Sequence, residues 1–289
     1  MNQKTISGTS WMILSVVFFS LMQLCVRLTG GEVSLFLQIL VRNLFGVALA
    51  LYYIRRDRLS WFGPREEQPF LFGRSIAGFL GILSFFYASR YGNLADVTIV
   101  NRTHPFFTTL FSAVFLKQSA PPRQWCALVL VFLGGVIAAD PSFTTASYPL
   151  LCAFLAAFFN GIAYTLLAHF RDKVPAWTVI AHFSVFSVAA SVPFLVGNFV
   201  WPSPQDLFLL VLIAVFGSGG QIAVTMAYRS APAGEVAIYD QLSIVCSMLQ
   251  GWGFLGQTPT LRTWLGGGVV VVTSLWIHRH PKTPRPEKD

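Results

Sequence analysis

An internal repeat constrains the fold of this chain more than any other feature of its sequence. Residues 71–131 align with residues 210–270 without a gap, at a constant offset of 139 positions. Apolar segments match one another by chance, so the alignment depends on its glycines, arginines and tryptophans. The matched pairs of these types are Gly78/Gly217, Gly81/Gly220, Arg90/Arg229, Arg123/Arg262 and Trp125/Trp264. We therefore predict two homologous halves, residues 1–140 and 141–280, followed by a basic tail, residues 281–289.

The composition places both halves in a membrane. Of the 289 residues, 54% are hydrophobic and only 11% are charged, whereas a soluble domain has roughly 25% charged residues. A helix that crosses the bilayer needs about 20 apolar residues. Ten runs of about this length are predicted as helices: 8–28, 33–54, 69–90, 93–116, 122–139, 147–170, 176–197, 205–229, 233–254 and 261–279. The sequence thus predicts an all-α integral membrane protein with ten transmembrane helices, five in each half.

The basic residues indicate how these helices are oriented in the lipid bilayer. If the N-terminus is cytoplasmic, fourteen Lys and Arg residues fall on the cytoplasmic side and three, Arg27, Arg90 and Arg262, on the opposite side. The positive-inside rule then predicts a multi-pass protein of the cytoplasmic (inner) membrane with both termini in the cytoplasm. The net charge of +8 follows from this orientation and does not indicate a nucleic-acid partner.

Five helices per half give the predicted repeat an inverted orientation. An odd number of spans means that the second half begins on the opposite face of the membrane from the first. Inverted repeats are the usual construction of secondary transporters. The sequence has no ATP-binding loop, so transport is expected to be secondary, by exchange with another metabolite, by facilitation or by coupling to an ion.

Five short motifs in the two halves match the sequence pattern of a known family. They are Phe85–Phe86–Tyr87–Ala88, Leu94–Ala95–Asp96–Val97–Thr98, Phe115–Leu116–Lys117–Gln118, Ala227–Tyr228–Arg229 and Phe254–Leu255–Gly256–Gln257. With these motifs, nearly the whole chain resembles the drug/metabolite transporter superfamily, in its EamA-type ten-helix branch. The resemblance implies a secondary transporter rather than an enzyme, with substrates such as amino acids, nucleotide-like metabolites or riboflavin. Members of this branch commonly have an acidic residue after the fourth and ninth helices, where this chain has Gln118 and Gln257.

Charged and polar side chains within the spans indicate a substrate pathway, because an ionised group in hydrocarbon is costly unless it faces protein or water. The offset of the repeat places Asn101 over Asp240 and Arg102 over Gln241. We predict that these four residues and Tyr239 form a substrate pocket. In the alternative interpretation, Arg102 and Asp240 form only a structural ion pair.

Further polar residues are expected to converge on this pocket from other helices. They are Gln23, Arg42, Arg74, Asn160, Tyr164 and Gln221. Arg74 lies near the end of its run, so its side chain could instead extend to the cytoplasmic headgroups. His104 is expected to be a packing residue rather than a proton carrier.

The arginines of these sets outnumber the one buried acid, Asp240, so the pathway is predicted to be electropositive. We therefore expect a small zwitterionic or anionic metabolite, such as an amino acid or a nucleotide-like compound. The four cysteines lack metal-ligand spacing, and neither a metal nor a cofactor is expected. The sequence specifies no oligomeric state. Two other classes stay open: an integral membrane enzyme acting on lipid, and a membrane subunit that transports nothing.

Overall fold

The computed structural model describes residues 7–29, 33–92, 94–139, 147–196, 199–255 and 260–279, and the predicted basic tail, 281–289, lies outside these ranges. The elements are α1 (Gly8–Leu28), α2 (Leu35–Arg56), η1 (Arg65–Glu67), α3 (Gln68–Tyr91), α4 (Leu94–Asn101), α5 (His104–Phe115), α6 (Pro122–Ala139), α7 (Ser147–His169), α8 (Ala176–Leu195), α9 (Pro204–Ser230), α10 (Ala233–Ala237), η2 (Ile238–Gln241), α11 (Leu242–Leu255) and α12 (Leu261–Arg279). All regular structure in the described ranges is helical, which confirms the predicted all-α class.

Polar residues in the loops help to determine where the helices begin. The side chain of Ser7 accepts a hydrogen bond from the backbone amide of Ser10 in the first turn of α1. The side chain of Ser203 does the same for the amide of Asp206 in the first turn of α9. Each bond satisfies an amide that has no partner within its helix. These helix starts agree with the breaks between the apolar runs of the sequence.

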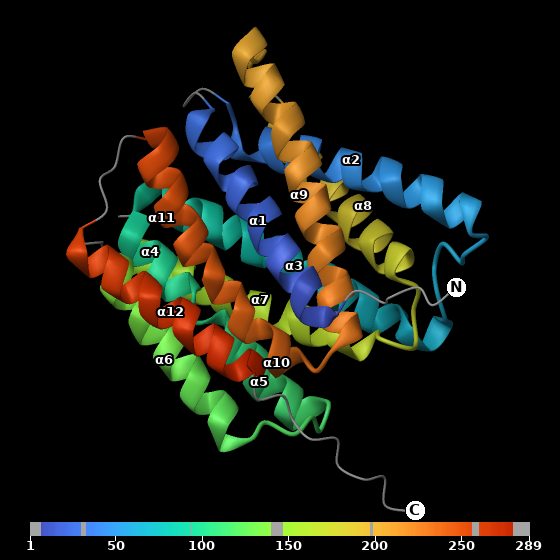
Figure 1. The fold of residues 1–289 in the computed structure, drawn as a ribbon. Coiled ribbons are helices and arrows are strands. Elements are labelled where there is room, and N and C mark those ends of the chain that lie inside the picture. Colours follow the sequence, from blue (N-terminus) through green and yellow to red (C-terminus); the bar gives the residue numbers. More distant parts are fainter. Residues whose placement is uncertain are drawn as a thin grey trace, which may run out of the picture.

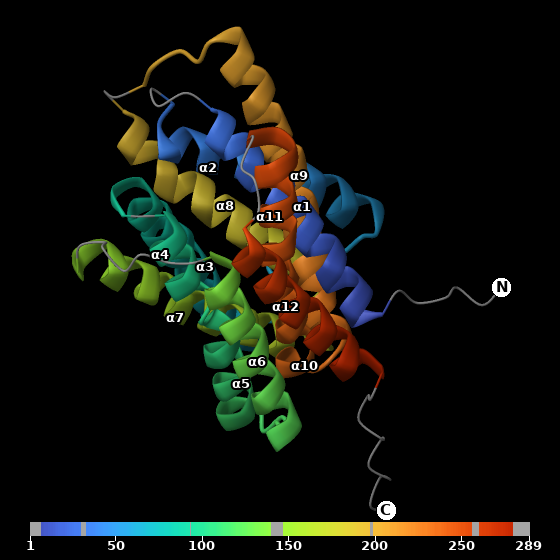
Figure 2. The ribbon, with the colours of Figure 1, turned by 60° about the vertical axis from the view of Figure 1, so that its left-hand side comes forward.

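The helices of the first half pack mainly on helices of the second half (Figures 1 and 2). α1 packs on α9 and α3 packs on α7, while α2 packs on α8 and α6 packs on α12. In the predicted repeat, α1 corresponds to α7 and α3 corresponds to α9. If each helix is replaced by its counterpart, the α1–α9 pair therefore becomes the α7–α3 pair, and the other two pairs stay the same. The largest buried cluster includes Met12, Leu71, Leu167 and Tyr228, one residue from each of α1, α3, α7 and α9. This packing is the arrangement that a twofold relation between the halves would produce.

Eight helical segments agree with eight of the ten predicted spans. Those long and apolar enough to cross a membrane are Gly8–Val26, Leu35–Arg56, Arg65–Ala88, Ser147–His169, Ala176–Leu195 and Pro204–Ser230. Two shorter apolar helices, Pro122–Ala138 and Leu261–Ile277, correspond to the fifth and tenth predicted spans. By length and composition, the structure is that of a multi-pass membrane protein.

The sequence predicts continuous helices over 93–116 and 233–254, and in this respect the prediction is wrong. α4 ends at Asn101 and α5 begins at His104, while the 3-10 helix η2 separates α10 from α11. Pro105 explains the first break, because proline fits the first turn of a helix, where its missing amide is not needed. At the offset of 139, the two breaks fall at matched positions.

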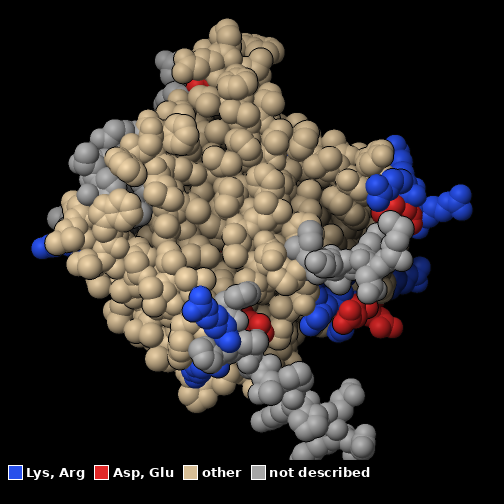
Figure 3. Space-filling model, in the orientation of Figure 1, with Lys and Arg blue, Asp and Glu red and all other residues tan. Residues whose placement is uncertain are grey.

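Charged side chains gather mainly at one end of the bundle and leave most of the visible surface without Lys, Arg, Asp or Glu (Figure 3). α1 begins and α12 ends toward this end, and α2 ends with Arg55 and Arg56. At the start of α3, the Glu67 carboxylate lies 2.9 Å from Nε2 of His169 and 3.3 Å from Nζ of Lys173. This end carries many of the basic residues that the positive-inside rule assigns to the cytoplasm.

Candidate functional site

The two helix breaks are joined by an ion pair inside the bundle. Arg102 follows α4, and Asp240 lies in η2. Nη1 of Arg102 is 3.0 Å from Oδ2 of Asp240, and Nε2 of His104 is 3.0 Å from the same oxygen. The side chains of Arg102, His104 and Asp240 are 9%, 4% and 13% exposed. The structure thus brings Arg102 and Asp240 together and largely removes their charges from solvent.

Polar side chains also bond the backbone that the breaks leave free. Nε2 of Gln241 donates to the carbonyl oxygen of Arg102 at 2.8 Å, which connects the ninth span to the fourth. The hydroxyl of Thr103 donates to the carbonyl of Val100 at 2.7 Å. Within a membrane, a carbonyl that lacks its helical partner must find another donor in the protein. Gln241, one of the predicted pocket residues, therefore stabilises the broken fourth span.

His104 has a role in this cluster that sequence reasoning missed. It is packed, as expected, with its ring 5.3 Å from the ring of Tyr164 in a T-shaped arrangement. Tyr164 in turn stacks on Tyr228 with 5.0 Å between the ring centroids. The unexpected feature is the contact of His104 with Asp240. The available signal was its position two residues after Arg102, on the span that carries two of the five residues of the predicted pocket.

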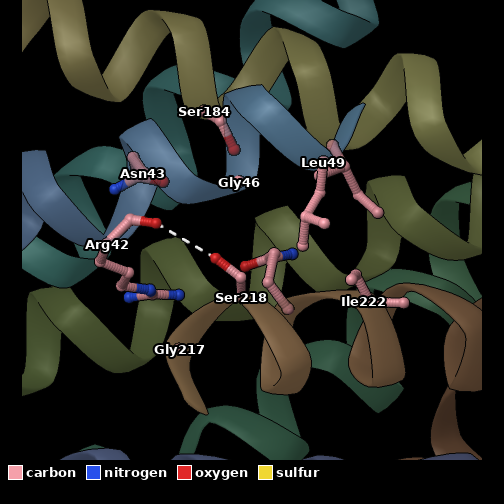
Figure 4. A pocket seen from close by; sticks show the side chains of 10 residues that line it. Arg42, Asn43, Gly46, Leu49, Ser184, Gly217, Ser218 and Ile222 are labelled. Atoms are coloured by element: carbon pink, nitrogen blue, oxygen red, sulfur yellow. Dashed lines mark hydrogen bonds between the residues drawn. The ribbon is translucent and has the colours of Figure 1, made fainter. Parts of the chain in front are cut away.

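A small pocket lies beside Arg42, between α2, α8 and α9 (Figure 4). Its polar lining includes Asn43, Ser184, Ser218 and Gln221. The Ser218 hydroxyl donates a hydrogen bond to the backbone carbonyl of Arg42 at 3.1 Å. The cavity has a volume of about 10 Å³, which is roughly the space that one water molecule needs. In this conformation the pocket is too small for a metabolite.

Arg74 lies inside the bundle and does not extend to the headgroups. Its side chain is buried, with 2% of the residue exposed, and its Cζ lies 4.0 Å from the ring centroid of Phe183 on α8. This burial contradicts the alternative in which Arg74 extends toward the cytoplasmic headgroups. The cation–π contact with Phe183 accounts for one face of the guanidinium.

Tyr164 of α7 connects the arginines to the ion pair. Its side chain lies within electrostatic range of Arg42, Arg74, Arg102 and Asp240. Because these charges come from α2, α3 and both broken spans, they converge from separate parts of the chain. The result is one polar region around Tyr164, with three arginines and one acid.

Two more of the predicted residues lie next to this region. Asn101 is buried, and its Oδ1 has no hydrogen-bond partner among the described residues. Gln221 lines the pocket of Arg42 and donates from Nε2 to the hydroxyl of Thr225 at 3.3 Å. Both side chains therefore present polar atoms to the interior between the two halves.

The remaining predicted residues have other surroundings. Tyr239 is buried in the large apolar cluster that contains Met12, so its ring contributes to packing. Asn160 is half-buried, and a Cβ placed on Gly81 would lie 2.5 Å from its Oδ1, so the missing side chain of Gly81 leaves room for it. Gln23 is half-buried on α1. The structure therefore does not place Tyr239 with the polar residues predicted beside it.

The chemistry of the region is that of ion pairing and hydrogen bonding. The described part of the chain contains no group of three or more His, Cys, Asp or Glu side chains that could hold a metal ion. His104 and Asp240 are two side chains of these types in contact, but Arg102 and His104 both already contact Oδ2 of Asp240. The arrangement can bind charged groups and position them between the two broken helices.

Three curated relatives resemble the chain over nearly its whole length. It is 27% identical over 278 residues to the pseudopaline exporter CntI of Pseudomonas aeruginosa, and the alignment covers 96% of this chain and 97% of that protein. It is 28% identical over 289 residues to human solute carrier family 35 member G1, and the alignment covers 92% of this chain and 77% of that protein. It is 24% identical over 283 residues to a riboflavin transporter of Rhizobium johnstonii, and the alignment covers 96% of this chain and 92% of that protein.

A solved structure shares the fold of this chain, and a family model matches its sequence. A crystal structure with 18% sequence identity has a TM-score of 0.78, and the match covers 95% of this chain and 99% of that chain. At this identity, the likeness shows the fold alone. The model of the EamA-like transporter family matches the chain twice, over residues 6–139 and 147–279. The chain therefore belongs to the EamA-like transporter family.

Proposed function

We propose that this protein is a secondary transporter that moves a small zwitterionic or anionic metabolite across the cytoplasmic membrane by alternating access. Its family is one of transporters and not of enzymes, which argues against the alternative of a lipid-modifying enzyme. The relatives named above include an exporter and a riboflavin transporter. A transport activity is therefore the starting point, and the substrate class and the mechanism are the proposal.

The observation that carries the proposal is the pair of matched helix breaks joined by Arg102, His104 and Asp240. Broken helices near the middle of the membrane are characteristic of substrate and ion sites in secondary transporters. A continuous pair of helices would pack equally well without the cost of burying these charges. The breaks therefore suit a site that must hold and release a polar ligand.

The proposed mechanism uses two inverted halves of five spans each, residues 1–140 and 141–280, with both termini in the cytoplasm. Three observations support it: the repeat at offset 139, the double match to the family model, and the exchange of the α1–α9 pair for the α7–α3 pair. In this scheme, the broken fourth span is α4 with α5, and the broken ninth span is α10 with η2 and α11. The halves exchange conformations and expose the polar region to each side in turn.

The charge of the polar region supports the substrate class. Arg42, Arg74 and Arg102 lie within range of Tyr164 together with one acid, Asp240. A metabolite that carries a carboxylate or a phosphate would offset this excess of positive charge. Because Asp240 is already bonded to Arg102 and His104, we assign it to joining the two breaks. A coupling ion or an exchanged metabolite supplies the energy.

Reconstitution into liposomes tests the proposed function. Purified protein is placed in liposomes loaded with unlabelled amino acids, nucleotides and vitamins, and radiolabelled forms of the same compounds are added outside. We expect uptake or exchange of at least one acidic or zwitterionic compound above the level of protein-free liposomes. Movement of no compound in either direction would favour the non-transporting subunit, and uptake of only cationic compounds would contradict the substrate class.

A further inference from the structure

Two arginines in the interior have no counter-charge among the described residues. Arg42 is 7% exposed and Arg74 is 2% exposed. Neither takes part in an ion pair within the described ranges, whereas Arg102 is paired with Asp240. Nε and Nη1 of Arg74 are buried without any hydrogen-bond partner in those ranges. No described acidic side chain thus neutralises the positive charges of Arg42 and Arg74.

An arginine cannot relieve this situation by losing its proton. Its guanidinium stays protonated in proteins, and a buried charge without a partner is strongly unfavourable. The contacts of Arg74 with the Phe183 ring at 4.0 Å and of Arg42 with the Phe19 ring at 5.5 Å offset part of this cost. A ring quadrupole does not replace an anion, so the two arginines call for a negatively charged ligand.

The two arginines lie beside neighbouring residues of α8. Cζ of Arg74 lies 4.0 Å from the ring centroid of Phe183, and Arg42 lines a pocket together with Ser184, the next residue of that helix. Arg42 also borders the pocket whose lining includes the hydroxyl of Ser218 and the amide of Gln221. Two planar guanidinium groups with the side-chain amide of Gln221 beside them suit the oxygens of a carboxylate or a phosphate.

A matched pair of glycines leaves room for both arginines. A Cβ at Gly217 would lie 2.8 Å from Cδ of Arg42, and a Cβ at Gly78 would lie 2.9 Å from Nη1 of Arg74. Gly78 and Gly217 are equivalent under the offset of 139. The two halves therefore keep equivalent positions free of a side chain where each buried guanidinium group lies.

We propose that Arg42 and Arg74 together bind the anionic group, a carboxylate or phosphate, of the transported metabolite. This proposal rests on the proposed function and assigns the anion to a place distinct from the Arg102–Asp240 pair. Arg102 already has its carboxylate, whereas no described carboxylate forms an ion pair with Arg42 or Arg74. The pocket at Arg42 must widen to admit the ligand, which alternating access provides.

Thermal unfolding of the purified full-length protein in maltoside detergent tests the anion site. The added compounds are sodium phosphate and sodium succinate, each compared with sodium chloride at matched ionic strength. We expect the unfolding temperature of the wild type to rise with the concentration of at least one of the two anions, because a ligand that binds only the folded form stabilises it. The Arg42→Met and Arg74→Met variants should lose this rise.

The ligand-free variants provide a second and independent readout. Removal of an unpaired buried charge should leave the unfolding temperature unchanged or raise it, since an apolar residue of similar size replaces an unsatisfied ion. Arg55→Met, on the exposed end of α2, removes one charge outside the site and should keep the full anion response. A drop in ligand-free stability of either site variant, with the anion response retained, would show a structural role and overturn the proposal.

Two further outcomes separate the sources of the anion and the two proposals. Stabilisation by added phosphatidylglycerol, but by neither soluble anion, would mean a lipid headgroup and would also overturn the assignment. If the wild type transports a metabolite in liposomes and Arg42→Met with Arg74→Met does so at the same rate, the site is wrong while the transporter stands. If the anion response depends on both arginines but nothing is transported, the site stands and the proposed function fails.

Discussion

The Asp240→Ala variant is expected to lose transport and to be less stable than the wild type by about 3 kcal/mol, as for other buried ion pairs that lose one partner. Asp240 accepts hydrogen bonds from both Arg102 and His104 at 3.0 Å. Without it, two buried cationic or polar groups lose their partner, and the two helix breaks lose their connection. Thermal unfolding and liposome uptake measure the two effects separately.

A double variant serves as the matched control for this prediction. Asp240→Ala combined with Arg102→Met removes both charges, so it should be more stable than Asp240→Ala alone while transport stays lost. This recovery is the coupling that a double-mutant cycle measures between two residues in contact. Equal stability of Asp240→Ala and the wild type would show that the ion pair does not form within the bundle.

The Gly266→Ala variant is expected to disrupt the packing of α12 on α6. A Cβ at Gly266 would lie well inside van der Waals distance of backbone atoms of Gly134 and Ala138. Backbone atoms cannot move aside as a flexible side chain can, so the two helices must separate. Overpacking of this kind costs typically 1–3 kcal/mol, and we expect a loss of roughly this size in thermal unfolding.

Gly268 provides the control on the same helix. Beyond the local backbone of α12, no described atom lies within 4 Å of a Cβ placed on Gly268, so Gly268→Ala changes the same residue type without a clash. Because alanine is the better helix former by about 1 kcal/mol, this variant should be as stable as the wild type or more so. If Gly266→Ala and Gly268→Ala behaved alike, the close approach of α6 and α12 would be wrong.

Much of the fold could be predicted because the bilayer permits few solutions. Apolar runs of about 20 residues must be helical there, and this rule located the boundaries of α1, α6 and α12 to within a few residues. The break in the fourth span has a local signal in Pro105, which lies in the first turn of α5. The family expected from the motifs is confirmed by the double match over 6–139 and 147–279.

The break in the ninth span could not be predicted from local sequence. No proline lies between Ile238 and Gln241, and η2 is held by contacts with the fourth span, such as the bond from Gln241 to the Arg102 carbonyl. Adjacent residues on a 3-10 helix such as η2 point about 120° apart. For this reason, Tyr239 faces the apolar cluster while Asp240 faces Arg102, although the two are neighbours in the chain.

It was equally impossible to predict from the sequence that Arg42 and Arg74 have no ion-pair partner among the described residues. An ion pair depends on which side chains meet in space, and the sequence showed only that arginines outnumber acids. Their position beside Gly217 and Gly78 became visible once the helices were packed. The repeat had indicated that the two glycines are equivalent, but it had not indicated that each one leaves room for a buried charge.

The most direct test of the account is the accessibility of the centre from each side of the membrane. In a variant whose four native cysteines are replaced by alanine, Ser218→Cys places one thiol in the pocket beside Arg42. A membrane-impermeant methanethiosulfonate reagent is applied to right-side-out and to inside-out vesicles. Alternating access predicts labelling in both preparations and protection by a transported metabolite, whereas labelling from one face alone, or from neither, would contradict it.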